Sequence, residues 1–340
     1  ERDGAGRIVI GPAEIRTQMK PVDVPPFMAG PQVTLFGPPD SAKMSINAMN
    51  ALHRRLPGED PLVAKLVSDS GHVPRWGADS EDSKTPMAHD LRLATRNLKG
   101  CYEHTLSFDD PVNGKSYRLA PDGLALPVKR VPGLALPDGD HLLDGEPMPL
   151  HLIELVQHIW LNRDTPEARV IYFPKLENDE EAVYLAATID AAERAVARRY
   201  PSYPLGSVRV ILVFENPRAI FRIREMGEAL YPYFLGGSLG WHDFLASTAR
   251  LFRHDSSYRI PVKADPDIVI RNIKESHAIL VRDLSEAGAL KIGGMYGILY
   301  QPGDIESFAA CMVGYIRDVV TQLKRGLDGF WVAHPDFVRI

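Results

Sequence analysis

The sequence has few cysteines and lacks long runs of one charge or of apolar residues. Its 340 residues include 2 Cys, too few for a disulfide framework or a thiolate zinc site. The 39 Lys and Arg nearly balance the 44 Asp and Glu, which argues against nucleic acid or an anionic membrane as a partner. No segment approaches the roughly 18 consecutive apolar residues of a spanning helix, and no signal-peptide core is present at the start. These absences predict a cytoplasmic protein in a reducing compartment.

What the chain does have is a regular alternation of short β-type runs and longer helical patterns. Residues 1–32 are rich in Pro, Gly and charge without a sustained period, and they predict an extended N-terminal segment. Residues 33–340 predict one large domain, with insertions near 57–74 and 100–124 that we expect in loops after strands. The predicted strands are VTLF (33–36), RWGA (75–78), LPVKR (126–130), VIYF (170–173), VRVILVF (208–214), YFLGG (233–237), LKIGG (290–294) and GFWV (329–332).

Two intervals show the helical period most clearly, because apolar residues recur at steps of three and four. The first, 180–199, carries a stripe formed by Ala182, Leu185, Ala186, Ile189, Ala192 and Val196. The second, 305–323, carries a stripe that we expect to face the core, formed by Ile305, Phe308, Ala309, Met312, Ile316, Val319, Val320 and Leu323.

Eight strands alternating with helices predict an α/β fold, a (β/α)₈ TIM barrel. The alternative is an open doubly wound sheet, which would carry a Gly-rich turn after its first strand. The turn GPPD (37–40) does not have the G-x-G-x-x-G pattern of such sheets. The barrel is therefore favoured.

Charged residues follow most of the predicted strands, where barrel enzymes carry their chemistry. Glu215 and Asp243 lie about one strand–helix unit apart, which predicts neighbouring strand ends and a shared hard cation such as Mg²⁺. Each could instead be an acid that stabilises a helix N-terminus. Arg130 ends an apolar strand, and an unpaired buried guanidinium is costly, so it should meet Asp79 and Glu81 or an anionic substrate.

The order of several motifs resembles the malate synthase family over about residues 33–335. Each motif alone is weak, but their shared order across some 300 residues is specific. The resembling segments are GPPDSAKMSINAMN (37–50), GADSEDSKTP (77–86), NGKSYRL (113–119), RVPGLAL (130–136), DGEP (144–147), PKLE (174–177), VFENPRAIF (213–221), GGSLGWHDF (236–244), GGMYG (293–297) and DGFWVAHP (328–335).

This resemblance implies an acyltransferase of the glyoxylate cycle, in which acetyl-CoA condenses with glyoxylate to give malate and CoA with Mg²⁺ as cofactor. It implies that Glu215 and Asp243 bind the metal. Arg130 would stabilise the enolate, and Asp79 and Glu81 would orient the arginine and the metal waters. The expected substrate-binding residues are Arg130, Gly240, Trp241 and His242.

The chain also departs from the family pattern. The usual Trp-Asp-Tyr is displaced to Trp241, His242, Asp243 and Phe244. The family's catalytic base is an Asp on a helical C-terminal plug domain, so the base is expected from outside this chain, which ends at Ile340. Three interpretations stay open: a malate synthase whose plug domain lies outside the sequence, a citrate-lyase β-type CoA-ester lyase that acts on malyl-CoA or citramalyl-CoA, and a non-catalytic binding relative. The preferred 2-oxo acid, the oligomeric state and a peroxisomal location are also left open.

Overall fold

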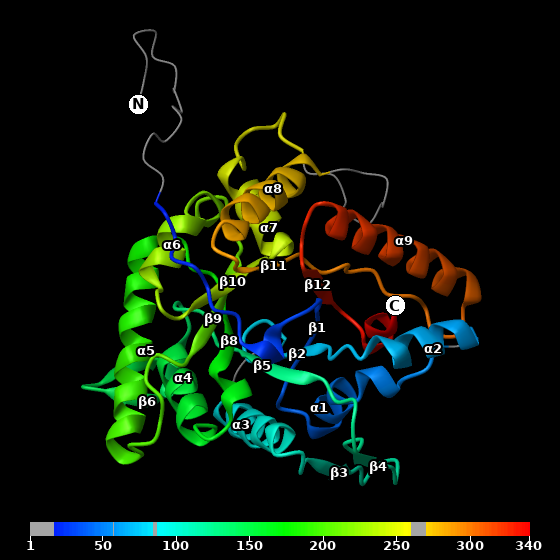
Figure 1. Ribbon diagram of the computed structural model, residues 1–340, viewed down its shortest axis with the longest axis horizontal. Helices are drawn as coiled ribbons and strands as arrows, with labels where there is room; N and C mark the ends of the chain where they lie inside the picture. The colour runs from blue at the N-terminus through cyan, green and yellow to red at the C-terminus, as the bar shows by residue number, and fades with distance from the viewer. Residues whose placement is uncertain (1–16, 57, 84–86, 260–269) are drawn as a thin grey trace.

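The computed structural model describes residues 17–56, 58–83, 87–259 and 270–340. Within these residues, eight parallel strands close into a barrel, and each strand pairs with its neighbours in chain order (Figure 1). The predicted (β/α)₈ barrel is confirmed. The strands are β1 (Gln32–Gly37), β2 (Arg75–Asp79), β5 (Leu126–Arg130), β8 (Val170–Phe173), β9 (Arg209–Phe214), β10 (Phe234–Leu239), β11 (Leu290–Ile292) and β12 (Gly329–Val332).

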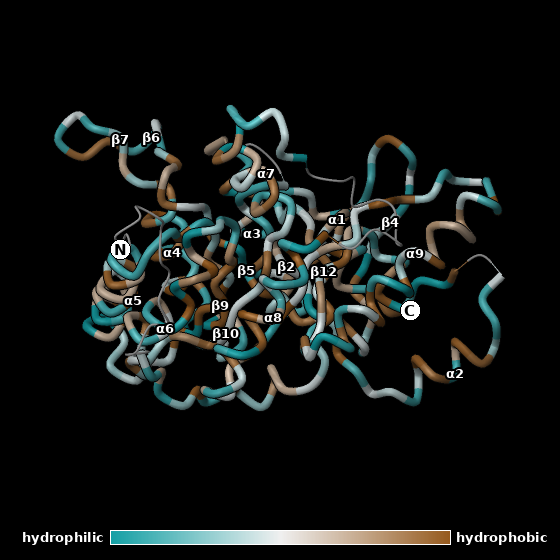
Figure 2. Tube along the Cα trace, turned by 90° about the horizontal axis from the view of Figure 1, so that it is seen from above, coloured by the Kyte–Doolittle hydropathy of each residue, from teal (hydrophilic) through white to brown (hydrophobic). Residues whose placement is uncertain are grey.

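The strands read as nearly continuous apolar runs because both of their faces are buried. One cluster fills the barrel interior and includes Tyr172, Ile211 and Trp331. Larger clusters lie between the strands and the surrounding helices. Figure 2 shows this distribution, with hydrophobic colour along the central strands and mixed colour along the helices.

The helix over 180–199 is confirmed as α5 (Asp179–Arg199), and Asn178 caps its first turn by accepting a hydrogen bond from the Glu181 amide. Five members of its predicted stripe are buried and Ala186 is partly buried. The other α-helices among the described residues are α1 (Ala42–Met49), α2 (Pro61–Ser70), α3 (Ala88–Tyr102), α4 (Leu150–Leu161), α6 (Ile223–Ala229), α7 (Trp241–Leu251), α8 (Arg271–Ser285) and α9 (Ile305–Lys324).

Helix α9 exists as predicted, but its predicted core-facing stripe is mostly wrong. Of that stripe only Met312 is buried, while Ile305 and Leu323 are exposed. The helix instead packs through Cys311, Gly314 and Tyr315. Gly314 permits this contact, because a Cβ there would lie 2.2 Å from the Tyr296 hydroxyl oxygen. The helix carries apolar residues on two sides, so spacing alone could not identify the packed side.

The two insertions were predicted at the C-terminal ends of the strands, but they lie at the N-terminal ends. Helix α2 (Pro61–Ser70) precedes β2, and the hairpin of β3 (Ser107–Asp109) and β4 (Ser116–Arg118) precedes β5. A segment that leads into a strand joins its N-terminal end, so neither insertion belongs to a loop after a strand. The hairpin that does follow a strand is β6 (Pro137–Leu143) with β7 (Glu146–Pro149), after β5.

The described part of the N-terminal segment covers the N-terminal end of the barrel; its first 16 residues lie outside the described residues. Met28 is 1% exposed and packs into the interior cluster. The Arg75 guanidinium, at the start of β2, donates to the carbonyls of Phe27 and Ala29 at 3.2 Å each. Gln32, at the start of β1, donates to the Met28 carbonyl at 2.6 Å. The segment therefore closes this end, and the cavity described below opens at the other.

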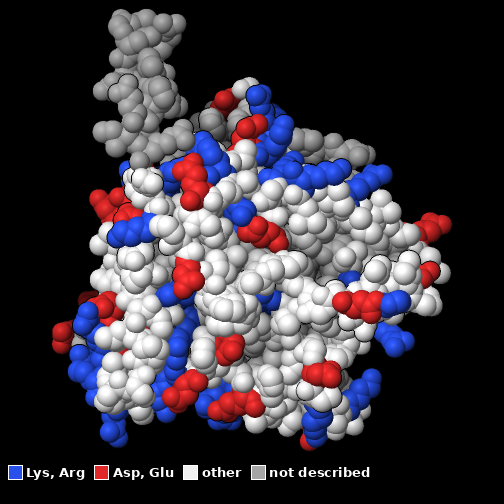
Figure 3. Space-filling model, viewed as in Figure 1, with Lys and Arg blue, Asp and Glu red and all other residues white. Residues whose placement is uncertain are grey.

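Among the described residues, no helix is long and apolar enough to cross a membrane. On the face shown in Figure 3, Lys and Arg are interspersed with Asp and Glu.

Met28→Ala should destabilise the protein by about 2–5 kcal/mol, because it removes a buried side chain from a packed end of the barrel. The free energy of unfolding, measured by denaturant titration, tests this. Met44→Ala is the matched control, since Met44 is 49% exposed. Equal effects of the two changes would contradict closure by residues 17–31.

Candidate active site and divalent-cation centre

A cavity of about 410 Å³ lies at the C-terminal ends of the strands. Its wall combines charged side chains with aromatic ones. The lining residues are Phe36, Asp79, Asp82, Ser83, Arg130, Glu215, Gly240, Trp241, His242, Asp243, Met295, Trp331 and Ala333. Seven of the eight residues predicted for the site line this cavity. The eighth, Glu81, lies behind the wall and reaches Arg130.

Arg130, the last residue of β5, is buried and held by a two-point ion pair with Asp79 at the end of β2. Its Nε lies 2.7 Å from Asp79 Oδ1 and its Nη2 lies 2.8 Å from Asp79 Oδ2. Burial opposes the charge on each partner, but their mutual attraction outweighs it. The pKa of Asp79 is therefore lowered and that of Arg130 raised from their ordinary values. The guanidinium also faces the rings of Phe36 and Trp331, so both charges persist beside the cavity.

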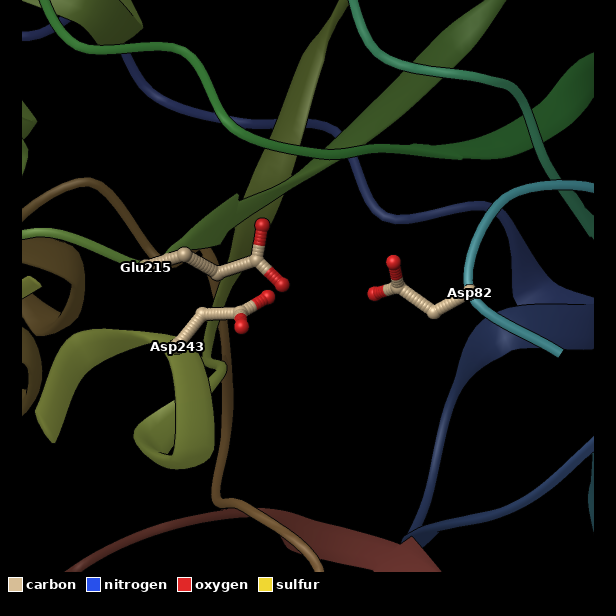
Figure 4. Close-up of side chains that lie close together, drawn as sticks. All are labelled: Asp82, Glu215 and Asp243. Carbon is tan, nitrogen blue, oxygen red and sulfur yellow. The ribbon is translucent and has the colours of Figure 1, made fainter. Parts of the chain in front are cut away.

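Three carboxylates from different elements converge on the cavity. Asp82 lies in the loop after β2, Glu215 follows β9 and Asp243 lies in the first turn of α7, and each offers an oxygen within 4.8 Å of the others (Figure 4). A set made only of carboxylate oxygens suits a hard cation such as Mg²⁺. The residues therefore fit the predicted cofactor, and Asp82 joins the two ligands expected from the sequence.

Two buried carboxyl groups at this site resist ionisation. Burial raises the pKa of Glu215 to about 8, against the opposing effect of Lys175 and Arg130. Burial likewise raises the pKa of Glu81 to about 7. Glu81 Oε2 is buried and has no hydrogen-bond partner, although the Arg130 Nη1 lies 3.5 Å away. Once both are ionised, the site holds more negative groups than Arg130 and Lys175 neutralise, which favours an added cation.

Because Gly240 has no side chain, the side chain of Glu215 can pack directly against its backbone. A Cβ at this position would lie 2.4 Å from Glu215 Cγ, so a larger residue would displace the carboxylate. The next residue, Trp241, donates from its Nε1 to the Met295 carbonyl at 2.7 Å. Its ring stacks on His242 with centroids 3.6 Å apart. These three residues form one wall of the cavity, and their contact with substrate stays a prediction.

Lys175, a charged residue directly after a predicted strand with no predicted role, lies among the carboxylates. Its Nζ is 2.9 Å from Glu81 Oε1 and 3.0 Å from oxygens of both Asp82 and Asp243. Its backbone has a φ of 59°, a left-handed conformation that costs a non-glycine residue roughly 1–2 kcal/mol. In this conformation its amide donates to Glu215 Oε2 at 3.0 Å. The signal available in the sequence was the basic residue of PKLE, directly after a strand.

The run Gly236–Gly240 also has the G-x-S-x-G spacing of a hydrolase nucleophile. Its serine, Ser238, lies within β10 and is completely buried. A nucleophile of that type sits exposed on a sharp turn after a strand. The spacing therefore does not identify a nucleophile here.

The fold and the cavity define a (β/α)₈-barrel protein with an acidic, arginine-containing site at the C-terminal ends of its strands. A sequence model of the malate synthase TIM barrel domain matches residues 127–340, more than half of the chain. The chain therefore belongs to the malate synthase family, as its motifs predicted.

Two relatives illustrate the similarity. The malate synthase of Streptomyces clavuligerus is 28% identical over 324 residues, which cover 93% of this chain and 55% of that protein. The glyoxysomal malate synthase of Gossypium hirsutum is 26% identical over 325 residues, which cover 94% of this chain and 53% of that protein. The chain thus spans about half the length of the curated relatives it matches.

Solved structures of Haloferax volcanii malate synthase share the fold. Its magnesium/glyoxylate complex matches with a TM-score of 0.54 and 14% identity over 90% of this chain and 73% of that chain. Its pyruvate/acetyl-CoA ternary complex matches with a TM-score of 0.54 and 15% identity over 91% of this chain and 68% of that chain.

Gly240→Ala should weaken Mg²⁺ binding by about tenfold or more, because the added methyl group displaces the Glu215 carboxylate. Isothermal titration calorimetry with MgCl₂ measures this change. Gly139→Ala is the control, since a Cβ at Gly139 meets no atom within 4 Å. Unchanged affinity in Gly240→Ala would show that Glu215 does not bind the ion.

In the metal-free protein, the stability that Glu215 contributes should be lost as the pH rises from about 4.5 to 8. Glu215 has a folded-state pKa raised to about 8, so the folded state holds a proton that the unfolded state releases, and this contribution disappears as the pH passes the folded value. Thermal melting in EDTA across this range tests the prediction. The difference in melting temperature between the wild type and Glu215→Gln should change across this range, whereas the difference from Glu306→Gln, at an exposed position on α9, should not. A profile as steep in Glu215→Gln as in the wild type would contradict the assignment.

Proposed function

We propose that this chain forms the barrel of a malate synthase, which condenses acetyl-CoA with glyoxylate in a Mg²⁺-dependent reaction. The observation that carries this proposal is the buried Arg130 next to three convergent carboxylates in one cavity. Membership of the malate synthase family supports it, as do the substrates named for the Haloferax volcanii complexes.

The carboxylates of Glu215 and Asp243, with Asp82, would hold Mg²⁺. When bound, Mg²⁺ supplies a Lewis acid that polarises the aldehyde of glyoxylate. Arg130 provides a fixed positive charge for the enolate oxygen of acetyl-CoA and for the alkoxide that forms. Because Asp79 already holds the guanidinium at two points, little reorganisation is needed when that charge develops.

The remaining residues shape the site. Phe36 and Trp331 flank the guanidinium, and Trp241 and His242 also line the cavity, so ring surface limits the access of water to the reacting groups. Excluding water strengthens the electrostatic effect of Arg130 and protects the enolate from protonation by water. The base that removes the methyl proton of acetyl-CoA is proposed to come from outside residues 1–340, on the resemblance to the family.

The cellular location of the protein is also a matter of proposal. A cytoplasmic location stays a prediction from composition. The glyoxysomal name of the Gossypium hirsutum relative is compatible with a peroxisomal location.

The protein purified from its source should release CoA from acetyl-CoA only when glyoxylate and Mg²⁺ are both present, as measured with a thiol reagent. Arg130→Lys should lower kcat by about 10²–10³-fold, because lysine keeps the positive charge but cannot make the two-point pair with Asp79 that fixes the position of that charge. Arg118→Lys, on the exposed β3–β4 hairpin, should leave kcat unchanged.

Other results would contradict condensation in distinct ways. Cleavage of malyl-CoA without condensation would identify a CoA-ester lyase. Mg²⁺-dependent glyoxylate binding by calorimetry without turnover in either direction would identify a binding protein.

A further inference from the structure

The ammonium group of Lys175 occupies the same carboxylate cluster that suits a divalent cation. Its Nζ lies 3.0 Å from Asp82 Oδ2 and 3.0 Å from Asp243 Oδ2, and 3.8 Å from Glu215 Oε2. These are the three residues that present oxygens within 4.8 Å of one another. One positive group of the protein itself therefore already compensates the proposed metal ligands.

An ammonium and a divalent cation cannot both sit among these oxygens. Mg²⁺ binds carboxylate oxygens at about 2.0–2.1 Å, which would bring it close to a like charge in a partly buried site. This repulsion has one of two results: the ammonium moves away, or the ion binds more weakly. The two cations therefore compete for the same ligands.

The structure lets the side chain of Lys175 move without its backbone. The backbone is fixed, because the Lys175 amide donates to Glu215 Oε2 at 3.0 Å. The side chain is 39% exposed, so its flexible stem has access to solvent at the mouth of the cavity. Arg130 differs in this respect, since its side chain is 5% exposed and bound by Asp79 at two points.

We propose that Lys175 is a tethered counter-cation, which holds the metal-free carboxylate cluster together and must withdraw when the divalent cation binds. Lys175 thereby sets the metal affinity of the site. This role rests on the cation site of the proposed function. It makes Lys175 a positioning residue that acts through Asp82, Glu215 and Asp243.

Calorimetric titration of the protein with MgCl₂ alone tests the competition, with no substrate present. Lys175→Met should bind Mg²⁺ about tenfold or more tightly than the wild type, because it removes the competing charge and keeps the stem. Lys175→Arg, which retains a cation, should stay close to the wild type. Lys291→Met is the matched control: Lys291 pairs with Asp328 at 3.1 Å at the other end of the barrel, and its loss should not change Mg²⁺ affinity.

Thermal melting provides a second readout that a purely structural lysine would not give. In EDTA, Lys175→Met should melt at a lower temperature than the wild type, because four carboxylates lose a shared cation. Saturating MgCl₂ should remove most of that difference. A difference that persists in MgCl₂ would overturn the counter-cation role.

The outcomes separate this proposal from the proposed function. Equal or weaker Mg²⁺ binding by Lys175→Met, with clear binding by the wild type, overturns the competition and leaves the metal site intact. Absence of binding in both proteins overturns both proposals. Tighter binding by Lys175→Met that disappears in the double variant Lys175→Met/Glu215→Gln supports both.

Discussion

The two-point ion pair between Arg130 and Asp79 is the interaction on which the site depends. Besides holding the guanidinium, Asp79 organises the loop after β2. It accepts hydrogen bonds from the Glu81 amide at 3.0 Å and from the Ser83 hydroxyl at 2.6 Å. That loop carries Glu81 and Asp82 to the cluster. One pair at the ends of two neighbouring strands thus positions both the positive centre and part of the negative one.

The second constraint is an imbalance of charge around a partly buried cavity. Five carboxyl groups surround two cationic side chains, and several of these groups are buried. Burial, with a smaller contribution from the neighbouring carboxylates, raises the pKa of Glu81 and of Glu215. A divalent cation would offset the excess negative charge, so this arrangement favours cation binding. The groups are Asp79, Glu81, Asp82, Glu215 and Asp243, with Arg130 and Lys175.

The strands and the strand-end residues could be predicted because each depends on local pattern. Buried parallel strands read as apolar runs, and polar residues directly after them must meet at one end of a closed barrel. The packed side of α9 could not be predicted, because the helix is apolar on two sides and Gly314 decides the contact. Lys175 was missed for a related reason: its role depends on a left-handed backbone that directs its amide to Glu215. No spacing in a single sequence reveals that conformation.

Closure of the N-terminal end by residues 17–31 has a consequence for how molecules can reach the cavity. Met28 and the Arg75 contacts cover the N-terminal end, so among the described residues the cavity is approached from the C-terminal ends of the strands. A small molecule bound at the depth of Arg130 shares that approach with any larger one bound above it. If a larger molecule covered the cavity, one at the depth of Arg130 would have to enter before it, so the shape of the barrel would favour an order of binding.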